Sequence, residues 1–144
     1  MALTAHAYPQ AQQKMGTKTL NLSSDSLKVM LLSAYTFANT HATMADVLAA
    51  GTEVTGTGYT AGGQALTSVT FTTSGTVTTL TCASPAWSSS TITASYAVFY
   101  DAAGGTNATN IPLCYWDFGG AQSSSAGTFT LTVAGGGLVA TTSS

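Results

Sequence analysis

The sequence contains very little charge. Among 144 residues there are 3 basic and 5 acidic side chains, and arginine is absent. Nucleic-acid binding depends on lysine and arginine residues that displace counterions from phosphates, and attachment to an anionic membrane surface has the same requirement. Three dispersed lysines and a net charge of -2 therefore predict a protein that binds neither nucleic acid nor a membrane.

Long apolar segments are also lacking. No run in the sequence approaches the ~20 residues needed to cross a bilayer. The N-terminal residues 1–9 have neither the basic start nor the apolar middle of a signal peptide. We therefore expect a soluble chain that is synthesised in the cytoplasm and is not exported by that route.

Histidine and cysteine are scarce as well. The histidines are His6 and His41, and no serine lies in a Gly-x-Ser-x-Gly motif. We predict that His41 is a loop or capping residue and not a catalytic base. Cys82 and Cys114 lack the spacing of a metal or redox motif, so we expect two small buried hydrophobic residues, with a disulfide between them as the alternative.

The carboxylates form no recognisable site. Asp25 and Asp101 fall in turn sequences, where aspartate bonds its own backbone. Asp117 lies inside a predicted strand, and we expect it to form hydrogen bonds at a strand end or an interface, with a functional role as the alternative. The glycine-rich segment 56–63 lacks the lysine of a P-loop and predicts a tight turn. Together these observations predict no catalytic residue, no metal and no cofactor, and hence no enzyme.

Threonine, serine and apolar residues take the place of charge. There are 27 threonines and 16 serines, while hydrophobic residues reach 44% and the mean hydropathy is +0.26. This composition can build a core and is unlike that of a disordered chain. Free monomers are commonly kept apart by surface charge, so its scarcity predicts a component of an assembly.

Short apolar or alternating segments separated by glycine-rich turns predict an all-β protein. The continuous apolar run 27–32 indicates a strand that is buried on both faces. Because no helices alternate with the strands, we predict an antiparallel jelly-roll-like or Greek-key β-sandwich. The predicted strands are 27–32, 68–72, 79–82, 92–100, 111–118 and 128–133.

One short helix is predicted near 44–50. Thr43 and Asp46 have the spacing of a capping box, and Gly51 is expected as the C-cap. Residues 1–18 are predicted to be an extended N-terminal arm, irregular or with one short helix, and residues 19–144 a single β-sandwich domain.

Aromatic residues concentrate on the two predicted central strands. Such side chains carry much of a core, and tyrosine and tryptophan are also enriched at interfaces. We predict that they form the core and a subunit interface, and an aromatic platform for sugars is the alternative. These residues are Tyr96, Phe99, Tyr100, Tyr115, Trp116 and Phe118.

Several motifs occur in an order that resembles a family of small tailed-bacteriophage structural proteins. They cover about residues 20 to 134 and end with a threonine-rich strand. The motifs are LNLSSDSLKVML at 20–31, MADV at 44–47, GYTAGGQAL at 58–66, AVFYD at 97–101 and PLCYWDFG at 112–119. The chain differs from many relatives in its lower charge and its longer loop 101–110.

The resemblance is to head decoration, or cement, proteins, which are jelly-roll-like domains on the outer surface of the capsid. It implies a virion protein that is not an enzyme, is made in the host cytoplasm and bridges subunits of the major capsid protein. The chain itself is the second expected partner, as a homodimer or alternatively a trimer. The family supplies no catalytic or ligand-binding residues. A tail or fibre component and a carbohydrate-binding module remain the alternatives.

Overall fold

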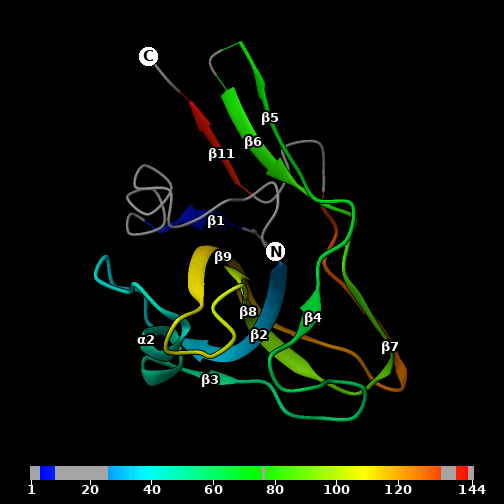
Figure 1. The fold of residues 1–144 in the computed structure, drawn as a ribbon. Coiled ribbons are helices and arrows are strands. Elements are labelled where there is room, and N and C mark those ends of the chain that lie inside the picture. The colour runs from blue at the N-terminus through cyan, green and yellow to red at the C-terminus, as the bar shows by residue number, and fades with distance from the viewer. Residues whose placement is uncertain (1–3, 9–25, 76, 134–138, 143–144) are drawn as a thin grey trace.

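The computed structural model describes residues 4–8, 26–75, 77–133 and 139–142. These residues form antiparallel strands and one short helix, α2 (Met44–Ala49) (Figure 1). The strands are β1 (Thr4–Ala7), β2 (Leu27–Tyr35), β3 (Gly51–Glu53), β4 (Gln64–Ala65), β5 (Thr70–Ser74), β6 (Val77–Thr81), β7 (Ala86–Ser90), β8 (Thr93–Asp101), β9 (Ile111–Ser123), β10 (Gly127–Thr130) and β11 (Val139–Thr142).

The strands are arranged in three sheets. The central sheet has the order β1-β9-β8-β2-β3, with β4 also paired to β2; a second sheet pairs β10 with β7, and a third has the order β11-β6-β5. Every pairing in the three sheets is antiparallel. The predicted all-β sandwich is confirmed.

Strand β2 lies at the centre of the core because its side chains are apolar on both faces. Val29, Met30, Leu31 and Leu32 are all fully buried. The register places Val29 opposite Phe99 of β8. Because successive side chains of a strand point to opposite faces, these four residues of β2 contribute to both faces of the sheet. The sequence prediction of a strand buried on both faces is therefore confirmed.

Helix α2 begins as its sequence predicts and ends differently. Thr43 and Asp46 form the complete capping box, and hydrogen bonds from the amides of Ala42 and Thr43 hold the pKa of Asp46 below its ordinary value. The C-cap is Ala50, and Gly51 is the first residue of β3, so the prediction for Gly51 was wrong. Glycine is needed there for close packing: an added Cβ would lie 2.6 Å from the carbonyl oxygen of Ala34.

The loop 102–110 contacts the helix, which the sequence did not reveal. The amide of Met44 donates to the carbonyl of Asn110 (2.9 Å), and the amide of Ala45 donates to that of Asn107 (2.8 Å). These amides belong to the first turn, whose donors have no partner within a helix. The loop therefore fixes the start of α2. Asp101 accepts the amide of Ala103 at 2.7 Å, as its turn position predicted.

The described part of the N-terminal segment is a strand of the central sheet. Strand β1 pairs with β9, and the amide of Tyr8 donates to the carbonyl of Leu113 at 3.1 Å. The arm was predicted to be extended, irregular or with one short helix, and residues 4–7 are extended and paired with the edge of β9. Residues 9–18 lie outside the described part of the chain.

The segment 56–63 is a tight turn, as predicted, and is held against β2. The Tyr59 hydroxyl accepts the Leu31 amide at 3.0 Å and donates to Glu53 Oε1 at 2.9 Å. The same carboxylate oxygen accepts the amide of Gly62 at 2.6 Å. Next to it, Gly63 has φ +78°, and an added Cβ would overlap the Val29 carbonyl.

Replacing Gly63→Ala should therefore destabilise the fold by about 2 kcal/mol or more, from left-handed backbone strain and the overlap together. The matched control is Gly105→Ala, because Gly105 has φ +85° and open space around it. The Gly105→Ala substitution should lower the free energy of unfolding only by the backbone strain, about 1 kcal/mol. Chemical denaturation of both variants measures the difference, and equal losses would contradict the role assigned to the Val29 contact.

Candidate functional site

The six aromatic residues predicted from the sequence lie mostly inside the chain. Tyr96 is half-buried, whereas the other five are at most 8% exposed, namely Phe99, Tyr100, Tyr115, Trp116 and Phe118. The core half of the prediction is thus observed. The interface half stays a prediction, and Tyr96 is the member with appreciable surface to offer a partner.

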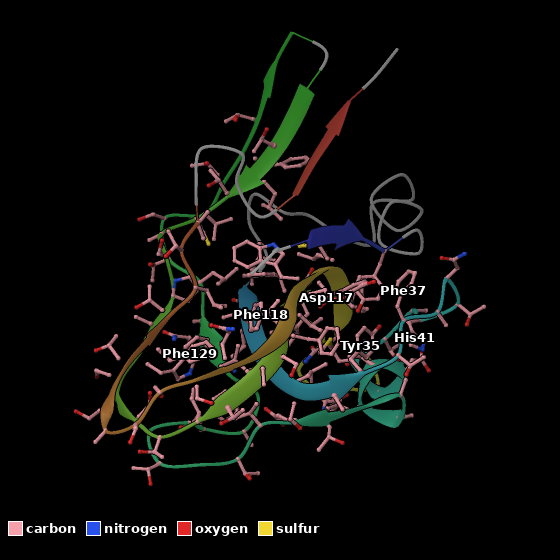
Figure 2. The ribbon with its side chains drawn as sticks, turned by 180° about the vertical axis from the view of Figure 1, so that it is seen from behind. Tyr35, Phe37, His41, Asp117, Phe118 and Phe129 are labelled. Carbon is pink, nitrogen blue, oxygen red and sulfur yellow. The ribbon has the colours of Figure 1, made fainter. Side chains whose placement is uncertain are left out.

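These residues divide between the two sides of β9. Phe99 and Trp116 are in edge contact, with ring centroids 4.9 Å apart, and Phe118 approaches Phe129 of β10 at 6.4 Å. Figure 2 shows Phe118 and Phe129 near β10, well away from Tyr35, Phe37 and His41 near α2. The six residues therefore do not form one continuous surface.

The second side carries a cluster that we call the tyrosine cluster. Phe37 and Tyr115 are stacked, with centroids 5.1 Å apart, and Tyr35 meets the edge of Tyr115 at 5.4 Å. Edge-to-face and offset stacked pairs of this kind add to the stabilisation from burial alone. The members of the cluster are Tyr8, Tyr35, Phe37, His41, Tyr96 and Tyr115.

A chain of hydrogen bonds runs through this cluster. The hydroxyls of Tyr8 and Tyr35 are 2.7 Å apart, and the Tyr35 hydroxyl lies 2.7 Å from His41 Nδ1. Burial raises the pKa of Tyr35 to about 12, and burial followed by the Tyr35 hydrogen bond also raises the pKa of Tyr8. Both phenols are therefore neutral at ordinary pH, and the ring of His41 is held in place by its hydrogen bond to Tyr35.

A groove of 570 Å³ opens beside the tyrosine cluster. We call it the Tyr96 groove. Its walls contain the rings of Tyr35 and Tyr96, three hydroxyl side chains from β2, β8 and the residue after β2, and the carboxylate of Asp117. The lining residues are Ser33, Ala34, Tyr35, Thr36, Ser95, Tyr96, Asp117, Gly119 and Gly120.

Asp117 and the two glycines form one end of the Tyr96 groove. Asp117 Oδ1 accepts the amide of Gly119 at 2.9 Å, so the carboxylate turns toward its own backbone. Asp117 lies inside β9 (Ile111–Ser123), so the prediction of a strand-end position was wrong, because the strand continues past Gly119. Gly119 has φ +74°, and a Cβ at Gly120 would meet nothing within 4 Å. This end of the groove therefore has room and a hydrogen-bond acceptor.

The Tyr96 groove carries groups that can bind a ligand. Aromatic rings, hydroxyls and one carboxylate can stack on a ligand and hydrogen-bond to it. Within the described residues, no group of three or more His, Cys, Asp or Glu side chains could hold a metal ion. A further groove of 420 Å³ lies between β9 and β10 and includes Trp116, Phe118 and Phe129.

The two cysteines are free and buried, so the alternative of a disulfide is not observed. Burial raises the pKa of both thiols, and for Cys114 the nearby Cys82 raises it further. Raised thiol pKa values disfavour the reactive thiolate. Their role in the structure is that of small apolar core residues, as the sequence predicted.

The third sheet, which we call the distal sheet, projects from the body of the molecule (Figure 1). It consists of β5, β6 and β11. Phe71 of β5 is 44% exposed, and it is the one large hydrophobic residue that is exposed among those described. The whole segment 54–100 contains no charged residue, so this sheet offers a neutral surface rich in hydroxyls.

Sequence reasoning missed Tyr8, Tyr35 and Phe37. They lie outside the recognised central strands or at a strand end, and only the tertiary fold brings them to Tyr115.

Comparison with family models, with curated proteins and with solved structures found no match. None of the described helical residues forms a segment long and apolar enough to cross a membrane.

Replacing Tyr8→Phe should destabilise the protein by about 1 to 2 kcal/mol, because it removes a hydroxyl that bonds to the buried Tyr35. Tyr96→Phe is the matched control, since the Tyr96 hydroxyl takes no part in the chain of bonds to His41, and it should change stability by less than about 0.5 kcal/mol. Thermal and denaturant unfolding measure both. Equal effects would show that the Tyr8 hydroxyl does not contribute through this chain.

Proposed function

We propose that this chain is a structural virion protein that binds the outer surface of a phage capsid and bridges subunits of the major capsid protein. The observation that carries the proposal is the scarcity of charge, with 3 basic and 5 acidic side chains among 144 residues. The resemblance of the ordered motifs to head decoration proteins supports the major capsid protein as the partner and the outer surface of the capsid as the location.

The composition supports attachment to a repeated surface. Modest contacts become strong when they are repeated over equivalent sites on a symmetric lattice. Serine and threonine offer hydrogen bonds at a small cost in side-chain entropy, because they have few rotamers to lose. A surface with little charge also lacks the repulsion that would keep neighbouring copies apart.

Co-sedimentation of the purified chain with emptied heads of its parent phage tests this proposal. We expect binding that saturates at a fixed small-integer number of copies per major capsid subunit, as equivalent lattice sites require. Heads of an unrelated phage are the control. Binding of one to a few copies at a single vertex, or none, would overturn the decoration role and favour a tail or fibre component.

The Tyr96 groove favours carbohydrate binding as a second candidate function. Sugar rings stack on aromatic faces and hydrogen-bond through their hydroxyls, and the groove combines two tyrosine rings with Asp117 and three hydroxyl side chains. Trp116 is only 3% exposed and does not present an open platform. A sugar would therefore contact Tyr96 first.

If the groove binds sugars, Tyr96→Ala should abolish glycan binding without unfolding the chain, because it removes the accessible ring. Tyr96→Phe keeps the ring and should retain most of the binding. A glycan array followed by calorimetry on any hit measures both variants. Absence of binding by the unmodified chain, or equal binding by the two variants, would exclude this second function.

A further inference from the structure

Strand β5 is an edge without the usual protection. Among the described residues, it pairs with β6 alone. Edge strands expose a row of backbone donors and acceptors, which proteins commonly shield with charge, proline or a bulge. The sequence of β5 is TFTTS, and its pairing with β6 continues from Thr70 to Ser74 without a register shift. None of those three protections is therefore present in this strand.

We propose that β5 pairs with β5 of a second copy of this chain, antiparallel across a two-fold axis, and joins two distal sheets into one. The proposal deepens the proposed function, on which it rests only for its biological role. The pairing itself belongs to the purified chain and needs no capsid.

The hydrogen-bonding pattern of β5 is self-complementary. The hairpin has a two-residue loop closed by Ser74 and Val77, with Gly75 at φ +62°. A hydrogen-bonded closing pair and the antiparallel alternation leave the backbone groups of Phe71 and Thr73 pointing away from β6. A two-fold axis at Thr72 then sets Phe71 opposite the second copy's Thr73, and the reverse, so both hydrogen-bonded pairs form.

Pairing would also cover the exposed ring. Phe71 lies opposite Leu80 of β6, and directly opposed residues share one face of a sheet. Leu80 is 1% exposed while Phe71 is 44% exposed, so Phe71 forms the open rim of an apolar row. Across the axis the two Phe71 residues become diagonal neighbours, at a spacing that aromatic side chains can bridge.

Electrostatics permits this pairing. No residue from 54 to 100 is charged, so two copies meet without repulsion at the interface. An acidic or basic partner protein would find no complementary charge on this sheet. The occupant that fits is a neutral strand of the same pattern, which a second copy supplies.

Sedimentation velocity of the full chain over the micromolar range tests the pairing. We expect a dimer. Thr73→Pro should convert it to a monomer, because proline removes an outward N–H without disturbing the bonds to β6. Thr72→Lys places two lysines opposite each other and should weaken the dimer roughly fivefold. An equal mixture of Thr72→Lys and Thr72→Glu should restore it.

Thr128→Lys is the matched control, because Thr128 is an exposed threonine on β10, and it should leave the dimer unchanged. Circular dichroism establishes that each variant is folded. A monomeric unmodified chain would overturn the pairing, as would a dimer that survives Thr73→Pro. A dimer that does not bind heads would overturn the proposed function instead, and a monomer that binds heads would overturn only the pairing.

Discussion

The burial of β2, β8 and β9 on both faces is the constraint on which the other elements depend. A strand with apolar side chains on both faces requires a layer on each side. Trp87 of β7 and Phe129 of β10 cover one side, and their rings are 6.1 Å apart. On the other side, Tyr8 and Phe37 pack against Tyr115 of β9, within the tyrosine cluster.

The regular elements could be predicted because their signals are local. The run from Leu27 to Leu32 has too few residues for a buried helix and is apolar at every position but Lys28. Thr43 and Asp46 contact each other within one helical turn, so their spacing alone identifies the start of α2. Sequence patterns of this kind depend on neighbours within a few residues.

Contacts between distant residues could not be predicted in the same way. Tyr8 and Tyr35 are 27 residues apart. Glu53 accepts hydrogen bonds from the turn 56–63 only because β3 lies beside β2. Alternation in β8 and β9 identified aromatic side chains but not which of them the covering layers would bury. The Tyr96 groove was therefore invisible in the sequence, although Tyr96 and Asp117 were both singled out from it.

The position of Lys28 has a consequence for proteolysis. The chain has three lysines and no arginine, so a protease specific for these residues finds no cleavage site after Lys28. Lys28 is half-buried in β2, where it pairs with Tyr100 of β8 and Ala65 of β4. Cleavage there requires the central sheet to open locally. The rate of trypsin digestion at this bond therefore reports the opening of the central sheet, and the residues after Lys28 are released as one fragment.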